Sequence, residues 1–245
     1  MAKRKKRGGQ CTASNPAGGP FDSDSLKAPD MMAAGDTTGS PKQDQTPVKL
    51  LVFDMGHVFV DFDWSEVCKG FYERAGLNRA QFTEVLAYVG SLGYEQGLVT
   101  TDQFLAAMNE KLSQKMTVEE FTQLWNFGFH ENPQMAELLQ SLRRQLPLYL
   151  LSNTNENHYS FVQSQFNVAR HFKELILSYE VGFAKPDERI FQEVLKRSGL
   201  TAPECLFVDD LKANIDAASA LGMKTIQFVT IEDLKERLTE YGISC

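Results

Sequence analysis

The feature that most constrains the fold of this chain is a series of short apolar runs that each end in polar residues. The first is VKLLVFD at 48–54, and the clearest of the others are PLYLLS at 147–152 and CLFVDD at 205–210. ELILS at 174–178 and KTIQFV at 224–229 continue the series. A continuous apolar run of this length is typical of a parallel strand that is buried on both faces. The runs therefore predict a parallel sheet.

Helical patterns separate the later runs. Pro186 begins one of them, and Gly199 stands where the C-terminal cap of that helix is expected. A second pattern covers residues 212–221 and ends at Gly222. Because strands and helices alternate, the sequence predicts an α/β fold in which a doubly wound parallel sheet forms the middle layer of three.

Residues 65–145 interrupt this alternation with four or five consecutive helical patterns. Two of the patterns begin with capping-box pairs, Thr100 with Gln103 and Thr117 with Glu120. We therefore expect a small helical bundle that is inserted between the first and second strands of the sheet.

The expected domain organisation follows from these patterns. Residues 1–46 are rich in small and polar residues and show no apolar period, so we expect a disordered N-terminal tail. The basic run Lys3–Arg7 could bind nucleic acid or an anionic surface, but a solvated tail is the favoured interpretation. The α/β core is expected at 47–64 and 146–245, on either side of the helical block.

The composition limits the partners and the surroundings. Asp and Glu outnumber Lys and Arg, 32 to 25, and the net charge of −7 argues against nucleic acid as the main partner. The four cysteines include no CxxC pair, which argues against zinc and favours a reducing compartment, and Cys205 is expected in the core. No apolar run approaches the roughly 18 residues that span a bilayer. We expect a cytoplasmic protein without membrane contact, and the sequence leaves the oligomeric state open.

Polar side chains stand at or just beyond the ends of several runs. They are Asp54, Ser152, Asn153, Lys185, Asp209 and Asp210. The carboxyl ends of parallel strands meet at one edge of a sheet, so these side chains are expected in one crevice. Carboxylates suit Mg²⁺, and a carboxylate can also attack phosphorus, while a lysine and a hydroxyl can hold phosphate oxygens. Each residue alone reads as a turn, cap or surface residue, but together they predict a site.

Four segments are similar to the four motifs of the haloacid dehalogenase superfamily. They are FDMGHVFVDFD, LLSNTN, GFAKPDERIF and FVDDLKANIDAA, and the resemblance covers residues 48–230. The residues of the first, second and fourth segments most resemble those of bacterial sugar-phosphatases of the alpha-D-glucose-1-phosphate phosphatase kind. The resemblance implies a Rossmann-like core of the superfamily's type with an inserted α-helical cap.

The resemblance also implies roles for residues that react with or bind the substrate. Asp54 would be the nucleophile that forms an aspartyl-phosphate. Lys185 would bridge Asp54 and the phosphate. Ser152, together with Asn153, would bind the phosphoryl group that is transferred.

A Mg²⁺ ion is the cofactor that the resemblance implies. Asp54 would contribute its second carboxylate oxygen, Gly56 its backbone carbonyl, and Asp210 its carboxylate. Asp209 would be a further ligand or would support the ligands from outside. Asn214 would either orient this loop or be an ordinary helix residue.

The inserted helical block resembles a mobile cap that closes over the site and selects the substrate. Tyr94, Glu95 and Trp125 are candidates for facing the site. Packing within the cap, or exposure on its surface, is the favoured interpretation for each of them.

Gly56 is the main departure from the superfamily pattern. Most of its phosphatases carry an aspartate there that protonates the leaving oxygen and later activates water, which is worth about 10² to 10⁴ in rate. Without that group the enzyme must be slow, prefer a more acidic leaving oxygen, or recruit another acid. His57, Asp61 and Asp63 are candidates, although packing, turn and helix-capping roles are favoured for them.

The sequence therefore predicts a hydrolase, a Mg²⁺-dependent phosphomonoesterase that acts on a small phosphorylated metabolite, expected to be a sugar phosphate. A metal-independent 2-haloacid dehalogenase is the alternative enzyme, but such enzymes replace the acids that this chain has at Asp209 and Asp210. A non-catalytic binding or regulatory protein is a further alternative, and Gly56 is its only support.

Overall fold

The computed structural model describes residues 46–245, except for the side chain of Trp64. The tail expected to be disordered, with the basic run Lys3–Arg7, lies outside the described residues but for residue 46. Within residues 46–245, no helix is both long and apolar enough to span a bilayer.

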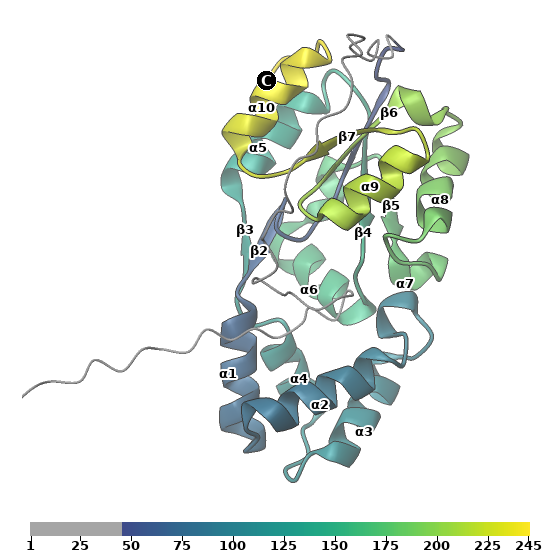
Figure 1. Ribbon diagram of the computed structural model, residues 1–245. Helices are drawn as coiled ribbons and strands as arrows, with labels where there is room; N and C mark the ends of the chain where they lie inside the picture. Colours follow the sequence, from purple (N-terminus) through teal and green to yellow (C-terminus); the bar gives the residue numbers. More distant parts are fainter. Residues whose placement is uncertain (1–45) are drawn as a thin grey trace, which may run out of the picture. The chain divides into compact units, whose positions relative to one another are not determined.

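Five parallel strands form the central sheet, as the apolar runs predict (Figure 1). Their order across the sheet is β5 (Glu174–Leu177), β4 (Leu148–Ser152), β1 (Leu50–Phe53), β6 (Cys205–Asp209) and β7 (Lys224–Gln227). The first strand of the chain therefore lies in the middle, between β4 and β6, and each neighbour is parallel to it. This order brings the ends of β4, β1 and β6 next to one another.

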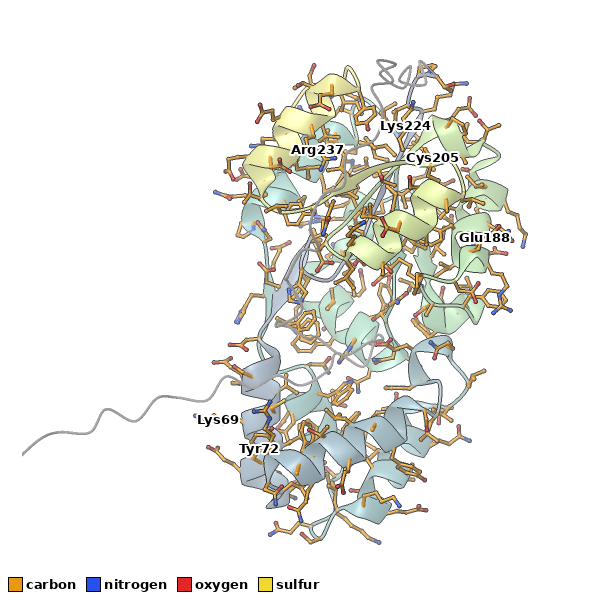
Figure 2. All side chains as sticks on the ribbon, viewed as in Figure 1. Lys69, Tyr72, Glu188, Cys205, Lys224 and Arg237 are labelled. Atoms are coloured by element: carbon orange, nitrogen blue, oxygen red, sulfur yellow. The ribbon has the colours of Figure 1, made fainter. Side chains whose placement is uncertain are left out.

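Helices cover both faces of the sheet, so the doubly wound α/β fold is confirmed (Figure 1). Successive residues of a strand point to opposite faces. Leu51 and Phe53 pack in one cluster with α5 (Pro133–Leu142), α6 (Glu156–Phe166) and α10 (Ile231–Glu240). Leu50 and Val52 pack in the other with α8 (Glu188–Ser198) and α9 (Lys212–Ala220). Cys205 begins β6 and is fully buried in the second cluster, as expected (Figure 2).

Three short elements complete the core. They are α7 (Ser178–Val181) and the 3₁₀ turns η2 (Val168–His171) and η3 (Ala202–Glu204). The short helix α7 follows β5 directly, and it therefore lies where the chain leaves the carboxyl edge of the sheet.

The inserted block consists of α1 (Trp64–Ala75), α2 (Arg79–Gly90), η1 (Tyr94–Gln96), α3 (Thr101–Lys111) and α4 (Val118–Trp125). The expected capping boxes are present at the starts of α3 and α4. Aromatic rings fill its interior, with centroids 5.0 to 6.5 Å apart between the neighbouring pairs that involve Phe71, Phe82, Phe121 and Trp125. The helices thus bury a core of their own.

Two features of residues 59–145 differ from the sequence expectation. β2 (Val60–Phe62) and β3 (Phe129–Glu131) form a two-stranded antiparallel ribbon at the two ends of the α1–α4 block. Helix α5, which the sequence places in the block, packs instead on the sheet through Met135 and Leu139. Strands of three residues carry too short a pattern to be recognised, and an amphipathic stripe does not reveal which surface will cover it.

Candidate active site

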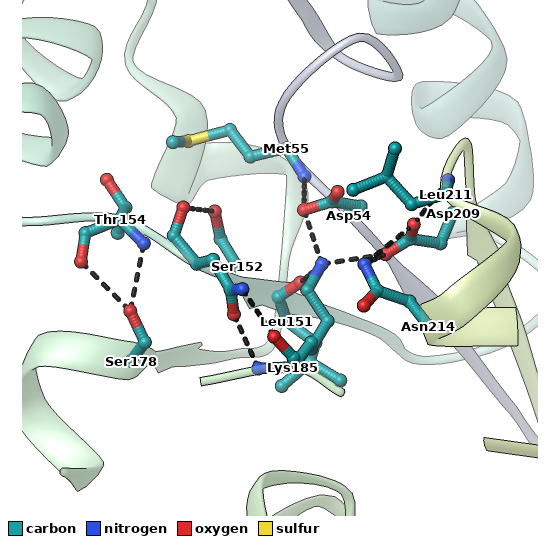
Figure 3. A network of polar contacts seen from close by, with 11 residues as sticks. Asp54, Met55, Leu151, Ser152, Thr154, Ser178, Lys185, Asp209, Leu211 and Asn214 are labelled. Carbon is teal, nitrogen blue, oxygen red and sulfur yellow. Dashed lines mark hydrogen bonds and ion pairs between the residues drawn. The ribbon is translucent and has the colours of Figure 1, made fainter. Parts of the chain in front are cut away.

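The site lies at the carboxyl edge of the sheet, where three neighbouring strands end in polar residues (Figure 3). Asp54 follows β1, Ser152 ends β4 and Asp209 ends β6. The parallel order β4-β1-β6 places Asp54 between the other two. The convergence that the strand ends predict is therefore present.

Three carboxyl groups gather in this crevice. One oxygen each of Asp54, Asp209 and Asp210 lies within 4.8 Å of the others. Asp209 is fully buried, Asp54 is 8% exposed, and Asp210 is half-buried. Oxygen ligands at this spacing suit a hard divalent cation such as Mg²⁺.

Lys185 is the cation that the protein itself supplies. Its buried ammonium lies 2.7 Å from Asp54 Oδ1 and 2.8 Å from Asp209 Oδ2, and it donates a hydrogen bond of 2.9 Å to the Leu151 carbonyl. Burial alone would lower the pKa of Lys185, but the charges of Asp209 and Asp54 outweigh burial and raise it. The side chain therefore stays protonated and links two of the three carboxylates.

Asp54 and Asp210 have raised pKa values, so their surroundings disfavour the ionised form. Burial raises the pKa of Asp54 to about 8, with Asp209 and Asp210 raising it further and Lys185 opposing the rise. Burial and the neighbouring Asp209 also raise the pKa of Asp210. Like charges crowded in a low-dielectric crevice disfavour ionisation unless a further cation balances them.

Asp209 is already engaged on several sides. Besides Lys185, its oxygens accept bonds of 3.0 Å from Asn214 Nδ2 and a bond of 2.8 Å from the Leu211 backbone N–H. Asn214 therefore orients the Asp209 carboxylate, one of the two interpretations that the sequence left open. Asp210, which is more exposed, is the better placed of the two for an outside ligand.

Asn153 does not lie as expected. Its side-chain amide donates to the Lys185 carbonyl at 2.8 Å, and its side-chain oxygen accepts from the Lys185 backbone N–H at 2.7 Å. The amide therefore holds the segment that carries Lys185, rather than turning into the crevice beside Ser152. Ser152 is buried at the strand end, with one long contact of 3.4 Å from its hydroxyl to the Asn153 carbonyl.

Ser178 is a site-supporting residue that sequence reasoning missed. It is fully buried, its hydroxyl accepts from the Thr154 N–H at 2.9 Å, and it contacts the Thr154 carbonyl at the same distance (Figure 3). This pair fixes the loop after β4 to the start of α7. The signal was available, because Ser178 ends an apolar run just as Ser152 does.

The turn after Asp54 positions Gly56. Met55 N–H donates to Asp54 Oδ1 at 2.6 Å, which restricts the rotation of that carboxylate. Gly56 pairs with Val60 as an isolated β-bridge and does not have a left-handed backbone. A Cβ atom at position 56 would lie 3.4 Å from the Phe62 ring. A side chain can therefore be built there, on the ring of Phe62.

The core candidates for a substitute acid lie in different places. Asp63 caps α1 by accepting bonds of 2.8 and 2.6 Å from Ser65, which also lower the pKa of Asp63, so its helix-capping role is confirmed. Asp61 lies in β2 with an exposed side chain, 3.9 Å from the His57 ring. His57 is close enough to Asp210 for its charge to lower the pKa of that residue.

The candidates from the helical block also differ in where they lie. Trp125 is buried and stacks on His158 of α6 with ring centroids 5.5 Å apart. Tyr94 is buried and stacks on Phe104 at 4.3 Å. Both rings pack in the interior, so their packing interpretation is confirmed. Glu95, by contrast, is near enough to Lys185 for that ammonium to affect its pKa.

Comparison with known proteins identifies the family. The model of haloacid dehalogenase-like hydrolases matches residues 48–222. The chain belongs to this family. It is therefore a hydrolase, and the Rossmann-like core of the haloacid dehalogenase type is confirmed.

The similar proteins include one phosphatase that this chain covers almost completely. D-ribitol-5-phosphate phosphatase of Bacteroides thetaiotaomicron is 32% identical over 203 residues, which is 78% of this chain and 97% of that protein. A crystal structure of a haloacid dehalogenase family enzyme from the same organism, in complex with magnesium and inorganic phosphate, superposes with a TM-score of 0.70 at 28% identity, covering 78% of this chain and 98% of that one. L-2-haloacid dehalogenase of Xanthobacter autotrophicus, at 18% identity and a TM-score of 0.54, covers 79% of this chain and 83% of that one and shares the fold.

Proposed function

We propose that this chain is a Mg²⁺-dependent phosphomonoesterase that hydrolyses a small sugar or polyol phosphate through an aspartyl-phosphate at Asp54. The observation that carries the proposal is the position of Asp54, which is held 2.7 Å from Lys185 within a cluster of three carboxyl groups. The named relative that acts on a polyol phosphate supports the substrate class.

The residues of the crevice suit attack on phosphorus. A carboxylate oxygen of Asp54 attacks the phosphorus atom, and the ester oxygen leaves on the opposite side. The ammonium of Lys185 offsets the negative charge of the phosphoryl oxygens, and the Ser152 hydroxyl donates to one of them. Asn153 keeps Lys185 in position through its two bonds to the backbone of that residue.

The donor set fits Mg²⁺. We infer that Asp54, Asp210 and the carbonyl of Gly56 hold the ion, with Asp209 supporting them through its bonds to Lys185 and Asn214. When bound, the ion supplies the positive charge that lets carboxylates and a phosphate share one crevice.

The alternatives have less support. A metal-independent dehalogenase does not need the carboxyl groups of Asp209 and Asp210, and the likeness to solved dehalogenases at 18% identity extends to the fold alone. A non-catalytic protein would not need the buried pairing of Asp54 with Lys185, which is costly to maintain without a reaction to perform.

The proposal also concerns the role of the helical block, the partner and the cellular location. We expect α1–α4 to act as the cap over the site, and we expect a small phosphate ester as the partner, with neither nucleic acid nor a membrane involved. The cytoplasm remains the predicted location.

Phosphate release should depend on added Mg²⁺. Metal charge stabilisation is worth several kcal/mol, so EDTA should lower the rate by at least about 10²-fold, and excess Mg²⁺ should restore it. A panel of sugar and polyol phosphates, assayed for inorganic phosphate with and without the metal, checks this. Full activity in EDTA, or halide release from a 2-haloacid, would favour the dehalogenase.

Asp210→Asn should separate metal binding from folding. The raised pKa of Asp210 means that the metal-free fold is more stable when this group is protonated, so stability is lost as the pH rises through the folded-state pKa. Without metal, the Tm of the variant should be at least as high as that of the wild type, with a larger advantage at about pH 8 than at about pH 5. With Mg²⁺ the order should reverse, because only the wild type gains binding energy, about 2.7 kcal/mol at 100 times the Kd.

The control for this comparison is Asp216→Asn, an exposed aspartate on α9 that pairs with Lys212. It should keep the full Mg²⁺-induced rise in Tm. An equal rise in Asp210→Asn would show that the metal does not bind at Asp210.

A further inference from the structure

The η1 turn carries one carboxyl group of the helical block towards Lys185. Gly93 and Gly97 flank the turn and have left-handed backbones, with φ of 71° and 68°. A Cβ atom on Gly97 would lie 2.1 Å from the carbonyl oxygen of Tyr179 in α7. Only glycine therefore allows the turn to sit this close to α7, the element that precedes Lys185.

Glu95 is the residue of this turn whose carboxyl group feels the charge of Lys185. Tyr94 is fixed in the interior of the block by its stacking on Phe104 and by a 2.8 Å hydrogen bond between its hydroxyl and Thr101. Successive residues of a 3₁₀ turn are about 120° apart, so Glu95 lies on a different side of the turn from Tyr94. It is half-buried and within electrostatic reach of Lys185.

We propose that Glu95 is the general acid and base of the reaction, in place of the carboxyl group that position 56 lacks. This inference rests on the proposed function and deepens it. In the first step, the Glu95 carboxyl proton passes to the leaving ester oxygen while its bond to phosphorus breaks and the Asp54 oxygen–phosphorus bond forms. In the second, the Glu95 carboxylate takes a proton from the water whose oxygen attacks phosphorus, and Asp54 leaves as a carboxylate. The products are an alcohol and inorganic phosphate, and Glu95 ends protonated.

The electrostatic surroundings suit both steps. Burial raises the pKa of Glu95 to about 7, and the ammonium of Lys185 limits the rise. Tyr179 and Glu180 are the other titratable residues on α7, against which the turn packs. An arriving phosphate anion would raise the pKa further, which keeps the proton on Glu95 for the first step. A pKa near the working pH is the most effective for a group that both donates and accepts.

His57 is the competing candidate from the core, and its position is less suitable. Its ring packs on Phe62 with centroids 4.3 Å apart, and its charge acts on Asp210. It therefore lies on the side of the inferred metal ligands. In an in-line displacement the leaving oxygen lies across phosphorus from Asp54, which is the side open to a residue from outside the α/β core.

The test compares two phosphate esters in Glu95→Gln, which keeps the shape of the side chain but has no proton to give. Protonation matters most for a basic leaving oxygen, so kcat/KM for a pentitol 5-phosphate should fall by about 10² to 10³-fold. The value for 4-nitrophenyl phosphate, whose leaving oxygen is far less basic, should fall less than about tenfold. A burst of nitrophenol should also appear, because water attack on the aspartyl-phosphate has lost its base.

Two further variants make the result specific. Glu84→Gln is the same change on an exposed position of α2 and should behave as the wild type for both esters. Gly56→Asp in the Glu95→Gln background should restore at least about tenfold of the lost rate on the pentitol phosphate, because a carboxyl group is returned to the site. A merely structural role of Glu95 would not be rescued from position 56.

The outcomes separate this inference from the proposed function. An active wild type whose Glu95→Gln variant keeps its rate on both esters, or loses both equally, would overturn the role of Glu95 and leave the phosphatase standing. The selective loss on the pentitol phosphate in His57→Ala instead would assign the role to His57. A wild type that hydrolyses no phosphate ester in Mg²⁺ would overturn both.

Discussion

Asp54→Asn should lower turnover by at least about 10⁴-fold, since loss of a covalent nucleophile removes the reaction path itself. Asparagine keeps the size of the side chain and one carbonyl oxygen for the Met55 N–H, so the fold should be retained. The measurement is the steady-state release of phosphate in Mg²⁺, with circular dichroism and Tm recorded on the same samples.

The matched control for this prediction is Asp216→Asn, which makes the same change on the exposed face of α9. Its turnover should equal that of the wild type. Turnover by Asp54→Asn within tenfold of the wild type, in a preparation free of contaminating phosphatase, would contradict a covalent role for Asp54.

Lys185→Met should damage both stability and activity, and it should be the most damaging of these changes to stability. It leaves Asp54 and Asp209 buried without the ammonium that lies within 2.8 Å of each, and breaking a buried ion pair in this way costs about 3–5 kcal/mol. Activity should fall by at least about 10³-fold, because the phosphoryl oxygens also lose their cation. Urea unfolding and phosphate release measure the two effects.

Lys196→Met tests whether such a loss is specific to the buried site. Lys196 pairs with Glu193 at 2.8 Å, but its side chain is 74% exposed, so its loss should cost less than about 1 kcal/mol. Equal destabilisation by the two substitutions would show that the Lys185 cluster adds nothing to the stability of the fold. Added Mg²⁺ should also narrow the difference in unfolding free energy between Lys185→Met and the wild type. It should leave the difference between Lys196→Met and the wild type unchanged.

The sheet and the strand-end residues could be predicted because their physical signals are local. A strand buried on both faces requires a continuous apolar run, and parallel strands place their carboxyl ends together. Asp54, Ser152 and Asp209 were therefore predictable as neighbours, although they are far apart in the sequence. The contact of Lys185 with Asp54 follows from the family resemblance, but its bond to Asp209 was not predictable.

The remaining features depend on contacts between distant segments. Asn153 turns its amide to the backbone of Lys185, which no pattern around either residue indicates. Glu95 reaches the neighbourhood of Lys185 because Gly97 fits against the α7 backbone, a steric match that exists only in the folded chain. Helix α5 packs on the sheet and not in the helical block for the same reason, since its apolar stripe fits either surface.

The most direct test of the account is the detection of the aspartyl-phosphate itself. Enzyme and 4-nitrophenyl phosphate are mixed in Mg²⁺, quenched with acid during the first turnover, and the digest is analysed by mass spectrometry. We predict a phosphoryl group on Asp54 in the wild type, more of it in Glu95→Gln, and none in Asp54→Asn. Phosphate release by the wild type, with no phosphorylated peptide in the wild type or in Glu95→Gln, would contradict the covalent mechanism at Asp54.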